Sequence, residues 1–337
     1  MKISASIYSD KRNELPETLR NCDIAKVDYL HVDCNNEPSV FNDIKYIKSK
    51  SQIPIDLHII SPNPHLFYPK IKKHKVENVA IQYEDVDGQL HIPDNVSTKF
   101  GLAITKKTSL DVFHKFKDSC SFILFMTTTP GQSGGTFDQA TFERIRKFQS
   151  MFPNKKIHVD GGVDDKVAFM LKSQGVYCAV SGSYLVNSTN MTRSMISLSN
   201  SNKDIANYKV RDFMSFLYEL PILYEDEATD LISTLEKITY YKTGFAIVID
   251  SSDKLIGIIT DGDIRRHLIK FLKKGESINN PKFLNKRPIT ILEDSTIDTL
   301  IDLLGKTKKP ITFVPVINKT KKLVGAISFN QLIKGVL

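Results

Sequence analysis

The most informative stretch of this chain is YLHVD, at residues 29–33, a largely apolar run that carries His31 and Asp33 near its carboxyl end. Two similar runs, IDLHII (55–60) and IHVDGG (157–162), carry His58 and Asp160. Short apolar runs bounded by turn residues are typical of buried strands. Histidine and aspartate at the carboxyl ends of such strands are typical of the active-site end of a parallel barrel. These stretches therefore indicate a parallel sheet and the place of its functional residues.

Five further apolar runs of similar length alternate with helix-like stretches. They are KISASIY (2–8), NVAIQY (78–83), GLAIT (101–105), SFILFM (121–126) and YCAVSGS (177–183). Eight strands that alternate with helices predict an α/β fold in which a parallel sheet closes into a (β/α)8 TIM barrel. A doubly wound open sheet is the alternative. It is disfavoured because no GxGxxG motif opens a first helix, and because polar residues end several strands around the set.

Length and composition limit the class of protein. The 337 residues exceed the usual size of one domain, about 100–200 residues, so we expect two domains. A hydrophobic content of 41% and a charged content of 25% exclude a disordered or fibrous chain. No apolar run approaches the ~20 residues needed to span a bilayer, and the polar start does not resemble a signal peptide. We therefore expect a cytoplasmic protein without a membrane partner.

Charge and cysteine usage exclude two further classes. The net charge of +8 comes from lysines interspersed with apolar residues, without the aromatic- and Arg-rich pattern of a nucleic-acid site. We expect a solvated helical face and no nucleic-acid partner. The four cysteines lack CxxC spacing, so they are expected to be buried thiols rather than zinc ligands or disulfides.

A second unit with an internal repeat follows the barrel. A Ser-, Thr- and Asn-rich stretch at 188–204 contains the last barrel helix and then a linker. Beyond it, FAIVIDSSDKLIGIITDGDI (245–264) and TFVPVINKTKKLVGAISFNQL (312–332) each predict strand, polar turn, strand and helix start. Such a repeat indicates two similar α+β modules that bury a shared face. The predicted division is a barrel at residues 1–205, a linker at 206–216 and a second domain at 217–337.

The polar residues of the barrel strands form a candidate metal site. His31 and Asp33 are two positions apart, so both side chains leave the same face of a strand. With His58 and Asp160 they complete a mixed nitrogen and oxygen set that suits Zn²⁺, Fe²⁺, Mn²⁺ or Co²⁺. A single strand histidine is more often a satisfied core group. Four polar groups in apolar strands would each need a separate partner, which favours one shared ion.

A metal beside two carboxylates suits proton abstraction next to a carbonyl group. Asp33 and Asp160 would remove a proton on one face and return one on the other, so that a carbon is inverted through an enediolate.

Glycines follow the last two predicted strands. The loops with Gly161 and Gly162, and with Gly182 and Ser183, occupy the usual phosphate-binding position of a barrel. The sequence therefore predicts a phosphorylated substrate.

Six motifs occur in the first part of the chain in the order KISASIYS, HVD, DLHII, FMTTTPGQSGGTF, VDGGV and VSGS. Together they resemble the ribulose-phosphate 3-epimerase family over about the first 200 residues. The resemblance implies a metal-dependent epimerase that inverts C3 of a ketopentose phosphate, interconverting ribulose 5-phosphate and xylulose 5-phosphate. It assigns the metal to His31, Asp33, His58 and Asp160, and acid–base catalysis to Asp33 and Asp160. Residues expected to bind the substrate are Ser6, His58, Met126, Gly134, Gly161, Gly162, Gly182 and Ser183.

The chain departs from the family pattern where the sugar is recognised. The family usually reads HVDVMDG, but here HVDCNNE places Asn35 where a methionine is expected, and Ile60 replaces a second methionine. The flexible loop, usually NPGFGGQ, reads TPGQSGG at 129–135. The sequence therefore specifies the type of reaction more closely than it specifies the substrate. Epimerisation at C3 of another ketose phosphate, such as a hexulose 6-phosphate, is the alternative.

The second unit resembles a cystathionine-β-synthase (CBS) domain pair. Gly257, Thr260 and Asp263 fit G-x-x-[ST]-x-x-D, which places a hydroxyl and a carboxylate at a strand-to-helix turn. A plain helix cap is the alternative reading of these residues. The resemblance implies a homo-oligomer whose Thr260 and Asp263 bind a regulatory adenine or cytidine nucleotide. In the second repeat Gln331 stands where the acid is expected, so we expect one competent and one degenerate site.

The segment TDGDIRR (260–266) adds an expectation about pathway. It resembles CBS pairs attached to arabinose 5-phosphate isomerases and some sugar nucleotidyltransferases, enzymes that feed surface polysaccharides such as capsule or lipopolysaccharide. An alternative from another class is a catalytically weak barrel in a nucleotide-sensing protein. The retained Asp33 and Asp160 argue against it.

Overall fold

The computed structural model describes residues 1–93, 97–132, 134–199, 208–274, 283–305, 307 and 311–328. Described residues up to 199 form one compact unit, and those from 208 form a second. Ser133 and Gln331, which the sequence implicates in the flexible loop and in the second nucleotide site, lie outside the described residues. None of the helices in the described ranges is long and apolar enough to cross a membrane.

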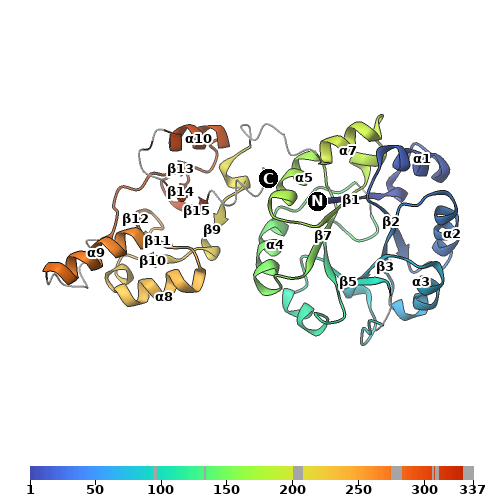
Figure 1. The fold of residues 1–337 in the computed structure, drawn as a ribbon, viewed down its shortest axis with the longest axis horizontal. Coiled ribbons are helices and arrows are strands. Elements are labelled where there is room, and N and C mark those ends of the chain that lie inside the picture. Colours follow the sequence, from blue (N-terminus) through green and yellow to red (C-terminus); the bar gives the residue numbers. More distant parts are fainter. Residues whose placement is uncertain are drawn as a thin grey trace. The chain divides into compact units, whose positions relative to one another are not determined.

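The first unit is a closed barrel of eight parallel strands in chain order, as the sequence predicts (Figure 1). The strands are β1 (Lys2–Ser6), β2 (Tyr29–Asn35), β3 (Ile55–Ile60), β4 (Asn78–Gln82), β5 (Lys99–Ile104), β6 (Phe122–Met126), β7 (Lys156–Asp160) and β8 (Cys178–Ser181). Most of their residues are buried, because one face fills the barrel and the other packs against the crossover segments.

Helices surround this ring of strands (Figure 1). They are α1 (Leu15–Ala25), α2 (Val40–Lys50), α3 (Tyr68–His74), α4 (Ala140–Met151), α5 (Asp165–Ser173), α6 (Ser183–Val186) and α7 (Met191–Ser199). Short 3-10 helices lie at Ile7–Ser9, Pro64–Phe67, Tyr83–Asp85 and Leu110–Lys115. The crossover from β5 to β6 thus contains a 3-10 helix, which buries Leu110 and Phe113, where the sequence predicts an ordinary helix.

The second unit contains two small sheets, with strand orders β10-β11-β12 and β13-β14-β15-β9. Its strands are β9 (Ser215–Phe216), β10 (Ile222–Tyr224), β11 (Phe245–Ile249), β12 (Leu255–Thr260), β13 (Ile291–Leu292), β14 (Phe313–Ile317) and β15 (Leu323–Ser328). Its helices are α8 (Leu231–Tyr241), α9 (Asp261–Lys274) and α10 (Ile297–Gly305), with 3-10 helices at Val210–Asp212, Leu217–Glu219 and Glu227–Thr229.

The two halves of this unit repeat one another closely. The pair β11/β12 and the pair β14/β15 are both antiparallel, and each has an irregularity at the corresponding place, Val248/Ile249 and Val316/Ile317. The rings of Phe245 and Phe313 stack with centroids 3.5 Å apart in a core that draws on both halves. The duplication predicted from the sequence is therefore a structural one, with a shared core.

The division at 1–205, 206–216 and 217–337 stays a prediction. Ser215 and Phe216, assigned to the linker by the sequence, form β9 and pair with Ala326 and Gly325 of β15.

Candidate active site

Register between neighbouring strands brings three of the predicted metal ligands together. Asp33 of β2 is paired with His58 of β3, and His31 lies two residues earlier on the same face of β2. Asp33 Oδ1 is 3.4 Å from His31 Nε2 and 3.3 Å from His58 Nδ1. Ligand atoms of these three residues all lie within 4.8 Å of one another. The pattern YLHVD followed by IDLHII therefore builds one site, not separate core contacts.

Asp160 joins this group from β7. Its Oδ2 lies 3.5 Å from His31 Nε2. That nitrogen is buried and, within the described ranges, forms no hydrogen bond, although it faces carboxylate oxygens of both Asp33 and Asp160. An orphaned buried nitrogen between two carboxylates is costly by itself, and a cation between them would satisfy all three groups. The residues present fit a divalent ion.

The two carboxylates have different proton affinities. Burial raises the pKa of Asp160 to about 6. The negative charge of Asp33 adds to this increase, and the charge of His31 opposes it without cancelling it. Burial opposes ionisation of Asp33 as well, but the nearby rings of His31 and His58 hold the pKa of Asp33 far below its ordinary value. Two carboxyl groups whose pKa values are pushed apart are typical of an acid–base pair.

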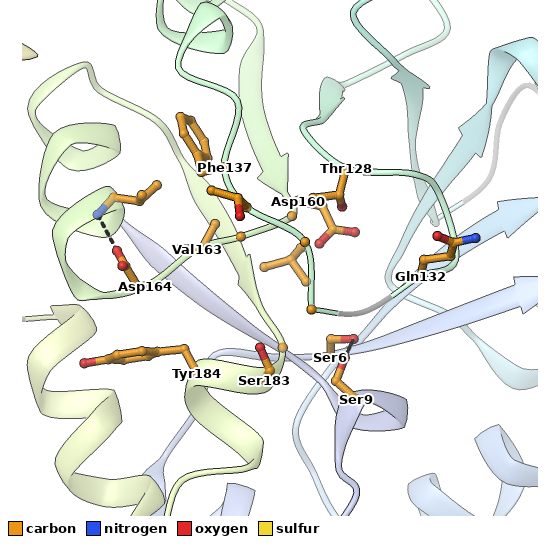
Figure 2. A pocket seen from close by; sticks show the side chains of 18 of the residues that line it. Ser6, Ser9, Thr128, Gln132, Phe137, Asp160, Val163, Asp164, Ser183 and Tyr184 are labelled. Atoms are coloured by element: carbon orange, nitrogen blue, oxygen red, sulfur yellow. Dashed lines mark hydrogen bonds between the residues drawn. The ribbon is translucent and has the colours of Figure 1, made fainter.

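A cavity of about 430 Å³ opens above these residues. Six of the residues expected to contact the substrate line it, namely Ser6, Gly134, Gly161, Gly162, Gly182 and Ser183. Figure 2 shows Asp160 and Thr128 on one side of this cavity, and Ser6, Ser9 and Ser183 on the other.

Two residues predicted to bind the substrate do not line the cavity. Met126 is buried in a cluster with Ala80, Ala103, Phe122 and Leu124, and His58 is fully buried beside Asp33. His58 therefore lies with His31 and Asp33 below the cavity, and Met126 belongs to the packed barrel interior.

The glycines after β7 are required by their surroundings. Gly161 and Gly162 have φ values of +111° and +62°, which other residues rarely adopt. A Cβ atom at Gly162 would lie 2.2 Å from the backbone nitrogen of Phe137. None of the described residues that line the cavity is lysine or arginine, so an anion here would depend on backbone N–H groups and hydroxyls.

The sequence did not single out two polar residues behind the histidines, Asp56 and Gln82. Asp56 Oδ2 is 3.2 Å from His31 Nδ1, and Gln82 Oε1 is 2.9 Å from His58 Nε2. Asp56 could have been noticed because it precedes His58 by two positions on one face of a strand. The partnership of Gln82 with His58 crosses strands and has no local signal.

Thr260 and Asp263 lie at the junction of β12 and α9, as expected. Asp263 Oδ2 accepts from the Thr260 hydroxyl at 2.6 Å and from the Thr260 N–H at 3.2 Å, and the Asp263 N–H donates back to the hydroxyl at 3.1 Å. Asp263 also pairs with Arg266. These residues thus form a reciprocal helix cap in the structure. A ligand that used their polar groups would have to replace or share those bonds.

Comparisons with known proteins agree with this architecture. The model of the ribulose-phosphate 3-epimerase family matches residues 2–186, and that of the CBS domain matches 210–270 and 282–337. Ribulose-phosphate 3-epimerase of Helicobacter pylori is 26% identical over 219 residues, which cover 61% of this chain and 100% of the relative.

The same enzyme of Methanocaldococcus jannaschii is 28% identical over 196 residues, covering 54% of this chain and 83% of the relative. The structure of CBSX2 in complex with AMP is 23% identical and covers 38% of this chain and 95% of that one, with a TM-score of 0.32.

Proposed function

The chain belongs to the ribulose-phosphate 3-epimerase family, a family of isomerases, and we propose that it inverts C3 of a ketopentose phosphate, converting D-ribulose 5-phosphate to D-xylulose 5-phosphate. The observation that supports this most directly is the orphaned Nε2 of His31, held between the carboxylates of Asp33 and Asp160. A divalent ion, Zn²⁺, Fe²⁺, Mn²⁺ or Co²⁺, would be held by His31, Asp33, His58 and Asp160.

The residues of the chain divide the chemistry between them. When bound, the ion supplies positive charge that stabilises the enediolate oxygens. One of Asp33 and Asp160 takes the C3 proton, and the other delivers a proton to the opposite face. The loops with Gly161, Gly162, Gly182 and Ser183 hold the phosphate through N–H groups and a hydroxyl. Ser6, on the opposite side of the cavity from Asp160, contacts the sugar.

A second substrate, a hexulose 6-phosphate, is favoured by the altered residues at the barrel mouth. Asn35 lies next to the loop after β6, because a Cβ atom at Gly131 would come within 2.6 Å of Asn35 Oδ1. This amide and Ile60 replace the two methionines expected in the family. The changed polarity alters which sugar hydroxyls can be accommodated.

One assay separates these substrates. Phosphorylated ketoses of five and six carbons are incubated with the metal-loaded protein in D₂O, and deuterium at C3 is followed by NMR together with product formation. We expect ribulose 5-phosphate to exchange and epimerise fastest. Faster turnover of a hexulose 6-phosphate would replace the substrate, and absence of C3 exchange with every sugar would exclude the epimerase function.

We further propose that the CBS pair regulates the barrel by binding an adenine or cytidine nucleotide through Thr260 and Asp263. The family match over 210–270 and the position of both residues at the β12–α9 junction support this role. Homo-oligomer formation, the cytoplasmic location and a role in surface-polysaccharide synthesis stay predictions from the sequence.

A further inference from the structure

The ring of His31 is held on both sides inside the barrel. Its Nδ1 lies 3.2 Å from Asp56 Oδ2, and its Nε2 lies 3.4 Å from Asp33 Oδ1. The register of β2 and β3 pairs His31 directly with Asp56, in the same way that it pairs Asp33 with His58. The two neighbouring strands therefore alternate histidine and aspartate across one face.

Asp56 determines which nitrogen of His31 carries hydrogen. Asp56 is 3% exposed, and its Oδ2 also accepts a hydrogen bond from the Ser4 hydroxyl at 3.0 Å. An ionised carboxylate only accepts hydrogen bonds, so His31 Nδ1 must be the donor. The neutral ring then has its lone pair on Nε2, the atom that faces Asp33 and Asp160.

The supporting residue of His58 contacts the other ring nitrogen, Nε2. Its Nε2 lies 2.9 Å from Gln82 Oε1, and Gln82 Nε2 donates to Glu84 Oε2 at 2.6 Å. Burial opposes ionisation of Glu84, but hydrogen bonds from Thr108 and Thr105 hold the pKa of Glu84 below its ordinary value, which keeps this group an acceptor.

The orientation of the Gln82 amide is thereby fixed, since its nitrogen must face Glu84 and its oxygen must face His58. His58 Nε2 is consequently the donor, and the lone pair of the ring lies on Nδ1, 3.3 Å from Asp33 Oδ1.

We propose that Asp56 and Gln82 are positioning residues that lock the two histidines in opposite tautomers, so that His31 Nε2 and His58 Nδ1 face one ion. The inference rests on the metal site of the proposed function. The two supports differ in chemistry, because Asp56 is a carboxylate and Gln82 is an uncharged amide. A carboxylate behind a ligand histidine increases its basicity, whereas an amide mainly orients the ring.

Zn²⁺ affinity of the full chain tests this proposal. Protein stripped with EDTA is titrated with Zn²⁺ against a competing chelator, for the wild type and for Asp56→Ala, Asp56→Asn and Gln82→Leu. We expect Asp56→Ala to bind about 10- to 100-fold more weakly, the loss typical of a removed partner behind a ligand histidine. Asp56→Asn should lose less, because its side-chain oxygen can still accept from Nδ1. Gln82→Leu should also weaken binding.

A matched control is Asp28→Ala. This change removes a carboxylate that binds the Lys2 ammonium and the Ile3 N–H in the same barrel, away from the histidines. It should leave Zn²⁺ affinity unchanged, which separates positioning from general destabilisation. A second readout is nitrogen-15 NMR of the histidine-labelled, Zn²⁺-loaded wild type, which should show one bound ring protonated at Nδ1 and the other at Nε2.

The outcomes are distinguishable. If Asp56→Ala or Gln82→Leu binds Zn²⁺ as tightly as the wild type, the positioning role of that residue is wrong. If NMR shows both bound rings in the same tautomer, the proposed opposite tautomers are wrong. Neither result would contradict the metal site itself. A wild type that binds no Zn²⁺, Fe²⁺, Mn²⁺ or Co²⁺ would instead overturn the metal site of the proposed function.

Discussion

Asp33 and Asp160 occupy different environments although both approach His31 Nε2. Asp33 lies within 3.4 Å of two histidine nitrogens, whereas Asp160 approaches His31 alone at 3.5 Å. The histidines therefore offset the effect of burial on the ionised form of Asp33, but only partly offset it for Asp160. The pKa of Asp160 consequently rises to about 6. A carboxyl group that titrates near neutral pH is suited to proton exchange with substrate.

Asp160→Asn should stop epimerisation while preserving the fold. An amide of the same shape can neither donate a proton as an acid nor accept one as a base, and we expect kcat to fall by about 10²–10⁴-fold. Turnover of ribulose 5-phosphate and C3 deuterium exchange measure this loss. Metal content and thermal unfolding of the variant show whether a lost ligand or a damaged fold is responsible. Near-normal turnover with bound metal would rule out the acid–base role.

His158, two residues before Asp160, is a buried base with no catalytic assignment. Its ring stacks on Phe122 at a centroid distance of 4.0 Å, and burial lowers the pKa of His158 from 6.5 to about 4. The folded ring is therefore neutral between about pH 4 and 6.5, where the ring in the unfolded chain is protonated. Because the unfolded state binds more protons in this window, stability falls as pH decreases from 6.5 towards 4.

His158→Phe should remove this pH dependence. Phenylalanine keeps an aromatic ring against Phe122 and cannot be protonated. Relative to its value at pH 7, the wild-type unfolding free energy should fall at pH 5 by about 2 kcal/mol more than that of the variant. Denaturant unfolding of the barrel at both pH values measures the difference. Parallel pH profiles for the two proteins would show that His158 does not titrate as inferred.

At the scale of elements, the barrel strands could be predicted because their signal is local. Apolar runs such as NVAIQY and SFILFM are buried on both faces, so each became a strand within a residue or two of its predicted bounds. The strands β9 and β13 have two residues each. They exist only through pairing with β15 and β14, which no pattern in their own sequence encodes.

The candidate site also contains residues that the sequence alone reveals and residues that only the structure reveals. His31, Asp33, His58 and Asp160 could be identified because each lies in or at the end of a short apolar run. The role of Gln82 depends on a histidine 24 residues away, on the neighbouring strand, and on Glu84 fixing its amide. Such partnerships arise from register across the barrel, so sequence periodicity does not reveal them.

The loop after β7 should be intolerant of a side chain. Gly162→Ala would place Cβ 2.2 Å from the Phe137 nitrogen, and φ is +62°. The loop must shift, so KM for the phosphorylated ketose should rise, with a stability loss above about 1 kcal/mol.

Gly175→Ala is the matched control for this loop. It also has positive φ, +75°, but its Cβ would meet only the Gln149 side chain at 3.6 Å. It should cost stability without changing KM. Equal KM values in Gly162→Ala and Gly175→Ala would contradict a phosphate-binding role for the loop.

At the scale of the whole molecule, the chain combines a catalytic family with a duplicated module. The two repeats of that module share a core around Phe245 and Phe313, so a ligand bound to one repeat can affect the packing of the other. The repeats differ at the acidic position, where Asp263 of the first corresponds to Gln331 of the second. This difference predicts that nucleotide binding is asymmetric.

Calorimetry of the full chain with AMP, ADP, ATP, CMP and CTP should therefore show about one site per chain. An aspartate can accept charge-assisted hydrogen bonds from two ribose hydroxyls, whereas Gln331 offers a neutral amide. Asp263→Ala should weaken binding at least about 10-fold, since bonds to a charged acceptor are worth roughly 1.5–3 kcal/mol. Gln331→Ala is the matched control and should bind as the wild type does.

Because Asp263 also caps α9 through Thr260, the thermal unfolding of Asp263→Ala must be recorded alongside its binding. A variant that unfolds near the wild-type temperature yet fails to bind assigns the loss to the ligand contact. In the wild type, saturating nucleotide should change kcat or KM for ribulose 5-phosphate, because the regulatory role requires the module to act on the barrel. Tight nucleotide binding with unchanged turnover would contradict regulation of the barrel by the CBS pair. Loss of nucleotide binding in Gln331→Ala instead of Asp263→Ala would assign the site to the second repeat.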